Sequence, residues 1–134
     1  MKIIPDILAD HILPFDWDVH LVWEEAAEVF PRPLTDFDYL LDLPLWSSVP
    51  NRGMLFDISP REVIAFPQRS PHQYQRVLKA NIIFPIDLVH YQEREWILDG
   101  VHRLANLYLM GTDFVSVRLH SNAIIPQITA RAEP

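Results

Sequence analysis

Apolar residues recur at helical spacing near the start of the chain. Between residues 19 and 30 they fall at intervals of three and four positions, on one face of a helix: Val19, Val22, Trp23, Ala26, Ala27 and Phe30. Asp16 is suited to cap this helix, and Pro31 and Pro33 are expected to end it. The pattern therefore predicts an amphipathic helix over most of this segment.

A second short helix is predicted over residues 36–42. Thr35 and Asp38 resemble a capping box at its start, and Pro44 follows its end. Residues 1–50 therefore predict a helical region.

The pattern changes after residue 50, where strand-like runs alternate with helical ones. Ser59-Pro60 and Ser70-Pro71 each begin a predicted helix, because serine caps a helix and proline suits its first turn. The second of these helices runs to about Ala80, and a third covers 101–110 with Gly111 after its end. The predicted strands are 54–58, 82–91, 93–99 and 114–120.

Composition narrows the classes of function. The chain has 134 residues, the size of one domain, and 49% of them are hydrophobic. Eleven basic against 18 acidic residues give a net charge of −7, which disfavours non-specific DNA binding. There is no cysteine, so disulfides, thiolate metal sites and cysteine nucleophiles are excluded. The three glycines are dispersed, so neither a P-loop nor a dinucleotide fingerprint can form.

The acidic charge is concentrated in the N-terminal part. Residues 1–50 hold 10 acidic and 2 basic residues, whereas residues 51–134 hold 8 and 9. The turn-forming residues at 50–53 predict a boundary between an acidic helical extension (1–50) and a core (51–134). The extension is suited to a basic protein partner. The sequence has neither a membrane-spanning apolar run nor a signal peptide, so we expect a cytoplasmic protein.

One segment carries the strongest chemical signal. An apolar strand ending at Leu98 leads directly into Asp99-Gly100, and a helix begins at once. The unpaired N–H groups and the dipole of a helix start favour an anion, most often a phosphate. Gly100 allows a ligand close to the backbone, and Arg103 adds donors suited to phosphate oxygens. Since a cation there opposes the dipole by ~0.3–1 kcal/mol, Arg103 suggests a role in binding.

Two further residues of this segment are candidates for chemistry. His102 can donate to a phosphate when protonated, or carry a proton. Asp99 can hold a divalent metal ion or accept a proton. The alternative is that Asp99-Gly100 is only a strand-to-helix turn, with Arg103 solvated or paired with Asp99.

The sequence Asp99-Gly100-Val101-His102-Arg103, with Leu104-Ala105 inside the helix, resembles the signature of the ParB/sulfiredoxin superfamily. Pro85-Ile86-Asp87 is similar to the Pro-Ile-Asp that opens the preceding strand in sulfiredoxins. The run from Phe56 to Pro60 is similar to the family's first strand and following turn. The resemblance covers about residues 54–125.

This resemblance implies an α+β fold, with a mixed sheet of about four short strands, helices packed on it, and here an N-terminal helical extension. It also implies a nucleotide-phosphate site at Gly100, Val101, His102 and Arg103, beside Asp99. In this superfamily such a site holds ATP, ADP or CTP, usually with Mg²⁺.

Two differences between this sequence and the family exclude or disfavour known activities of its members. Val101 replaces the sulfiredoxin cysteine, which excludes sulfinic acid reduction. ParB partition proteins add a helix-turn-helix domain for which these 134 residues leave no room, so a DNA-partition role is not expected.

Other candidates lie outside the motif. Asp57 and Asp87 are possible bases or metal carboxylates, although each is more often a turn or cap residue. Arg69 and His72 flank the start of a helix at which ParB relatives place an arginine near the nucleotide. Arg76 and Lys79 are expected on the solvated face of that helix, where their aliphatic stems can cover apolar surface.

Four hypotheses follow. The first is a Mg²⁺- and nucleotide-dependent phosphotransferase or hydrolase that acts on a small molecule, with Asp99, His102, Asp57 and Asp87 as candidate catalytic residues. The second is a nucleotide-responsive regulatory module without catalysis. The third, a nuclease or DNA-partition protein, is disfavoured by the charge. The fourth is an interaction module that binds no nucleotide.

Overall fold

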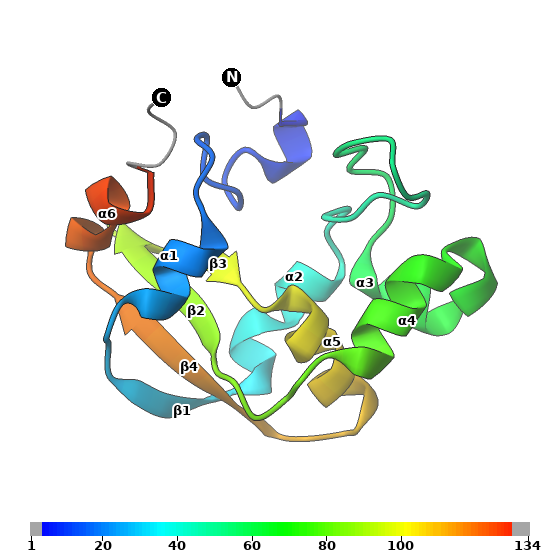
Figure 1. Cartoon of the computed structure of the whole chain (residues 1–134). Coiled ribbons are helices and arrows are strands. Elements are labelled where there is room, and N and C mark those ends of the chain that lie inside the picture. The colour runs from blue at the N-terminus through cyan, green and yellow to red at the C-terminus, as the bar shows by residue number, and fades with distance from the viewer. Residues whose placement is uncertain (1–3, 130–134) are drawn as a thin grey trace.

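The computed structural model describes residues 4–129 and contains a mixed sheet (Figure 1). Its four strands in this part of the chain are β1 (Val29–Pro33), β2 (Ile86–Tyr91), β3 (Arg94–Asp99) and β4 (Phe114–His120), in the order β1-β4-β2-β3. β2 and β4 are parallel, and the two other pairs are antiparallel. The predicted α+β class with a mixed four-stranded sheet is confirmed.

Helices cover both faces of the sheet. They are α1 (Val19–Glu24), α2 (Asp38–Leu41), α3 (Pro60–Ala65), α4 (Pro71–Lys79), α5 (Val101–Leu109) and α6 (Ile125–Thr129). Buried residues of α2, α3, α4 and α5 form one core with Ile86 and Val117 of the sheet. Residues of α1 and α6 form a second core with Val89 and Trp96 on the other face. No helix within residues 4–129 is both long and apolar enough to cross a membrane.

The predicted helix over residues 19–30 is wrong in its second half. The helix α1 ends at Glu24, and Phe30 lies in β1. Its N-cap is Asp18 rather than Asp16, since the Asp18 carboxylate accepts a hydrogen bond from the His20 N–H. β1 is an edge strand that pairs only with β4, a position that tolerates prolines because the outer N–H groups are not needed.

The end of α1 is held by a side chain from the sheet. Arg118 of β4 donates to the carbonyl oxygens of Val22 and Glu25, at 3.0 and 2.9 Å. A cation suits these carbonyls, because they form the negative end of the helix dipole. A contact between residues more than 90 positions apart explains why the local pattern alone missed this helix end.

The N-terminal part contributes to the sheet through β1. Residues 34–41 form a 3₁₀ turn (Leu34–Phe37) followed by α2, close to the predicted helix over 36–42. The predicted capping box of Thr35 and Asp38 is wrong. Pro33 is the N-cap of the 3₁₀ turn and Phe37 is the N-cap of α2, and no side chain within residues 4–129 makes a capping hydrogen bond at either start.

The predicted strand over 54–58 is also wrong. This segment makes only an isolated bridge between Trp46 and Ile58. Phe56 has a φ of 51°, which breaks an extended run. The strand expected from residue 82 begins only at Ile86, directly after Pro85, because proline cannot donate to the ladder.

The remaining predictions for the core are confirmed, apart from the cap of α4. β3, α5 and β4 match the ranges 93–99, 101–110 and 114–120. The helix α3 has a capping box, with Ser59 and Glu62 hydrogen-bonded to each other's backbone N–H at 3.1 Å. At α4, by contrast, the Ser70 hydroxyl donates to the Ser48 carbonyl and does not cap the helix.

Candidate functional site

The junction between β3 and α5 consists of a single glycine. Gly100 has a φ of +117°, a conformation that residues with a Cβ rarely adopt. A Cβ there would lie 2.7 Å from Cγ2 of Ile86. Within the described chain no side chain caps the start of α5. Glycine therefore allows the helix to begin directly after the strand, with its first N–H groups uncapped by a side chain.

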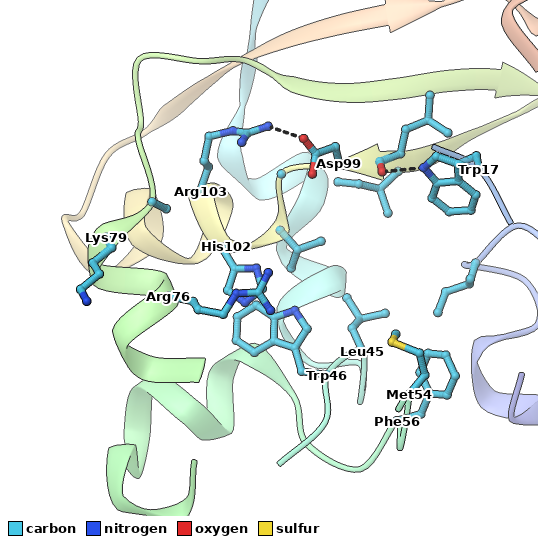
Figure 2. Close-up of a pocket in the computed structure, with 16 residues that line it drawn as sticks. Trp17, Leu45, Trp46, Met54, Phe56, Arg76, Lys79, Asp99, His102 and Arg103 are labelled. Atoms are coloured by element: carbon cyan, nitrogen blue, oxygen red, sulfur yellow. Dashed lines mark hydrogen bonds and ion pairs between the residues drawn. The ribbon is translucent and has the colours of Figure 1, made fainter. Parts of the chain in front are cut away.

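Asp99 and Arg103 form an ion pair beside this junction. Nη2 of Arg103 lies 3.2 Å from Oδ2 of Asp99 (Figure 2). The same Nη2 donates to the Pro85 carbonyl at 3.1 Å. The indole Nε1 of Trp23 also donates to Oδ2 of Asp99, at 2.7 Å. The pairing that we gave as the structural alternative for Arg103 is therefore present, and it orients the guanidinium at the start of α5.

His102 is held between an aromatic ring and an amide. Its imidazole stacks on Trp46 with ring centroids 4.1 Å apart and an angle of 7° between the planes. Nε2 of His102 lies 2.7 Å from Oε1 of Gln73, whose Nε2 donates to the Ser47 carbonyl at 3.1 Å. Because Oε1 of Gln73 can only accept, this network assigns the imidazole proton to Nε2 of His102.

The environment of His102 disfavours its charged form. Burial, followed by the positive charges of Arg76 and Arg103 and the nearby His72, lowers the pKa of His102 from 6.5 to about 3. At neutral pH the imidazole is therefore uncharged. In this state His102 forms part of the wall of the site, held by its stacking on Trp46 and its hydrogen bond to Gln73.

A cavity of about 650 Å³ opens in front of the start of α5 (Figure 2). The motif lines it with Asp99, Gly100, Val101, His102 and Arg103, and α4 adds Arg76 and Lys79. The other walls are mostly apolar and aromatic: Ile12, Trp17, Leu45, Trp46, Met54, Phe56, Ala80, Ile97 and Leu98.

The charged groups of this cavity are mainly positive. Three cations, Arg76, Lys79 and Arg103, line it together with one carboxylate, that of Asp99. This balance contrasts with the net charge of −7 for the chain. The cations and the uncapped helix start together favour an anion.

Arg76 and Lys79 are the residues whose position the sequence did not reveal. Both are exposed, as expected, but they also border the cavity. Their spacing of three residues on α4 was a usable signal, because it puts both on one side of a helix. What the sequence could not show is that α4 packs beside α5 with that side toward the motif.

The two candidate carboxylates outside the motif have protein partners. The Asp57 carboxylate accepts from the N–H and the hydroxyl of Ser48, at 2.7 and 2.6 Å. Asp87 is buried, with Oδ1 2.6 Å from Nε of Arg118 and 2.9 Å from Nε2 of His120. Neither carboxylate lines the cavity in front of α5.

Arg69 and His72 likewise do not line that cavity. The guanidinium of Arg69 lies over the ring of Phe66, and its Nη1 is 3.5 Å from Oε2 of Glu62. Nδ1 of His72 lies 3.2 Å from the Ser70 hydroxyl. The structure thus brings together the motif residues, and it places the other four candidates elsewhere.

No protein-family model, curated protein or solved structure matches this chain. Among residues 4–129, no group of three or more histidine, aspartate or glutamate side chains is arranged to hold a metal ion. The inference of function therefore depends on the geometry of the cavity.

Proposed function

We propose that this chain is a nucleotide-binding domain of the ParB/sulfiredoxin-like superfamily, with the phosphates at the start of α5. The observation that carries the proposal is the positively charged cavity at an uncapped helix start in an acidic protein. The motif of residues 99–103 supports it, because the strand–glycine–helix geometry that the motif predicts is present.

The phosphate groups would lie against the first turn of α5. Backbone N–H groups of Val101 and His102, in the first turn of a helix that no side chain of the described residues caps, would donate to phosphate oxygens, and the helix dipole would add favourable potential. Arg76 and Lys79 approach from α4 and add two mobile cations. Arg103 adds a guanidinium whose orientation is set by Asp99.

The base and sugar would lie against the apolar walls. Met54 is 66% exposed and offers a polarisable surface against which a base would pack, whereas Trp46 and Phe56 are largely buried and complete the apolar wall. A volume of about 650 Å³ lies in the range of sites for small molecules and cofactors. A cavity lined by cations and by apolar side chains suits the two chemical parts of a nucleotide.

Mg²⁺ would reach this site with the nucleotide. Mg²⁺ usually binds one or two carboxylates and completes its shell with phosphate oxygens and water. Asp99 is the carboxylate that lines the cavity, and its Oδ2 already accepts from Trp23 and Arg103. Asp99 can therefore supply one oxygen, Oδ1, and the phosphates would supply others.

The catalytic form of the proposal is a phosphotransferase or nucleotide hydrolase that acts on a small molecule. Arg103 and the helix start would stabilise charge on the transferred phosphoryl group. His102 is uncharged and donates to Gln73, so we assign it a positioning role. Asp99 is the candidate within the cavity for a base or for a Mg²⁺ ligand, and its Oδ1, which has no partner among residues 4–129, would serve one of these roles.

A nucleotide-responsive module without catalysis is the second candidate. It is favoured by the hydrogen bond from Trp23 of α1 to Asp99, which links the acidic N-terminal part directly to the motif. A ligand that moves Asp99 would weaken or break its hydrogen bond with Trp23 and so loosen the attachment of α1. This candidate predicts that nucleotide binding alters the protease sensitivity of the N-terminal part and that the nucleotide stays intact. The first candidate predicts that the nucleotide is converted to a product, which ³¹P NMR detects.

The test is thermal unfolding with ATP, ADP, CTP and GTP, each with and without Mg²⁺. A ligand at about 100 times its dissociation constant stabilises the native state by about 2.7 kcal/mol. We expect this stabilisation for the wild type and a large loss of it in the double variant Arg76→Ala/Lys79→Ala. Both side chains are exposed, so the variant is expected to fold.

A matched control removes two cations elsewhere. Arg52→Ala/Arg94→Ala has the same net charge as the test variant, but neither residue lines the cavity. It should retain the nucleotide effect. The absence of stabilisation by any nucleotide, or an equal effect in both double variants, would contradict the proposal.

A further inference from the structure

A second cavity, of about 600 Å³, shares Arg103 with the first. Its walls come from the end of α1, the loop to β1, and the segment before β2, including Trp23, Ala26, Val29 and Phe84. The carboxylate of Asp99 lines the first cavity and not the second. Arg103 therefore borders two separate spaces that have different surroundings.

The second cavity is surrounded by exposed apolar side chains. Trp23 is 51% exposed, Val29 53% and Phe84 57%. Large apolar side chains that remain exposed around a concave site are typical of a surface that binds a ligand. The three residues come from separate segments of the chain, so their meeting at one cavity is a property of the fold.

The charged groups of this cavity favour an anion. Two guanidiniums, those of Arg103 and Arg118, and one carboxylate, that of Asp87, line it. Asp87 is already paired with Arg118 at 2.6 Å. The charge of Asp87 is thus compensated by Arg118. Arg103 is paired with Asp99 through Nη2, on the side of the first cavity, so a ligand in the second cavity would meet the remaining donors of this guanidinium.

Arg103 has donors to spare. In the described part of the chain its hydrogen bonds, to Pro85 and Asp99, both come from Nη2. Its Nε is buried and has no partner. Because Nε is shielded from solvent, a ligand in the cavity would engage Nη1, which makes no hydrogen bond in the described part of the chain. Such a bond to a carboxylate is charge-assisted and therefore stronger than a bond between neutral groups.

We propose that the second cavity binds a small organic carboxylate with an apolar body, whose carboxylate pairs with Arg103. The apolar part lies against Trp23, Val29 and Phe84. A monoanion fits better than a phosphate here, because desolvating a dianion in a mainly apolar site is more costly. This site goes beyond the nucleotide site and does not depend on it.

The test uses benzoate and hexanoate as probes, with benzamide and hexanamide as uncharged counterparts. ¹H–¹⁵N NMR spectra of the full chain, without nucleotide, report the Nε–H of Arg103 and the indole N–H of Trp23. Arg103→Lys and Trp23→Phe assign the two signals. We expect both signals to shift in a saturable way with a carboxylate, and the amides to bind at least about tenfold more weakly, since charge-assisted bonds are roughly twice as strong as neutral ones.

The decisive variant fills the second cavity with a larger side chain. Ala26 is exposed, so Ala26→Phe is expected to fold while it occupies the space of the ligand. It should weaken carboxylate binding, and Phe84→Ala should do so by removing a wall. Ala65→Phe, at an exposed site that lines neither cavity, is the matched control and should bind like the wild type.

Three results would overturn the proposal. The amides could bind as tightly as the carboxylates, Ala26→Phe and Phe84→Ala could bind the carboxylates like the wild type, or the NMR shifts could be confined to residues of the first cavity. Failure here leaves nucleotide binding untouched, because no nucleotide is present. Conversely, the absence of stabilisation of the wild type by any nucleotide would contradict the nucleotide site and leave the carboxylate result standing.

Discussion

Gly100 shows how one position sets the geometry of the site. Its positive φ lets the chain turn from β3 into α5 within one residue, and its missing Cβ leaves room for Ile86. Both requirements are met only by glycine. The same residue also keeps the first turn of α5 open to the cavity.

Gly100→Ala should destabilise the protein more than Gly111→Ala. Gly111 also has a positive φ, of 76°, but nothing lies within 4 Å of the Cβ that would be added. Each substitution incurs backbone strain of order 1–3 kcal/mol, and only that at Gly100 adds a clash. Urea denaturation of both variants measures the difference. Equal free energies of unfolding would mean that Ile86 moves aside without cost.

His102 should make stability depend on pH. Its folded-state pKa, about 3, lies below the ordinary histidine pKa of 6.5, so the unfolded chain binds this proton first as pH falls. The stability that the neutral imidazole contributes is fully present above about pH 6.5. It is lost as pH falls toward 3, with a slope of up to about 1.4 kcal/mol per pH unit.

Removal of the imidazole isolates this effect. His102→Asn should flatten the fall in stability between pH 6.5 and 4.5 relative to the wild type, as measured by urea denaturation at each pH. An NMR titration of the His102 ring should show no protonation over the same range. Parallel stability curves for the two proteins would contradict the assigned neutral state.

At the scale of elements, Arg118 joins the sheet to the N-terminal part. It binds Asp87 within the sheet and the carbonyl groups at the end of α1. Arg118→Met keeps the length of the side chain but leaves Asp87 with His120 as its remaining partner. Breaking a buried pair in this way costs about 3–5 kcal/mol. Hydrogen exchange should also become faster in α1 and β1.

Arg32→Met is the matched control for this prediction. Arg32 pairs with Asp36 and Glu95 nearer the surface, where an ion pair contributes about 0–1 kcal/mol. Its loss should change the free energy of unfolding little. If Arg118→Met lowered the free energy of unfolding no more than Arg32→Met does, the contacts of Arg118 with Asp87 and the end of α1 would not stabilise the protein.

The elements that the sequence predicted correctly are those with local signals. The capping box at Ser59 and Glu62 and the alternation in 114–120 are readable within a few residues. The end of α1 and the strand β1 were missed because their causes are distant. The helix end depends on Arg118, and β1 depends on pairing with β4.

At the scale of the whole molecule, the positive cavity is assembled from separate parts of an acidic chain. The sequence predicted the contribution of residues 99–103, because strand, glycine, helix and arginine follow one another directly. It did not predict that Arg76 and Lys79 border the same space, or that Trp46 stacks on His102. Those features depend on how α4 and the 45–56 segment pack around α5, which no local pattern encodes.

The most direct test of nucleotide binding is a ¹H–¹⁵N NMR titration of the full chain with ATP and Mg²⁺. We predict that the largest saturable shifts fall on the backbone N–H groups of residues 100–103, accompanied by the side-chain signals of Arg76 and Lys79. Binding without shifts at the start of α5, or no saturable shift anywhere, would contradict the proposed phosphate site.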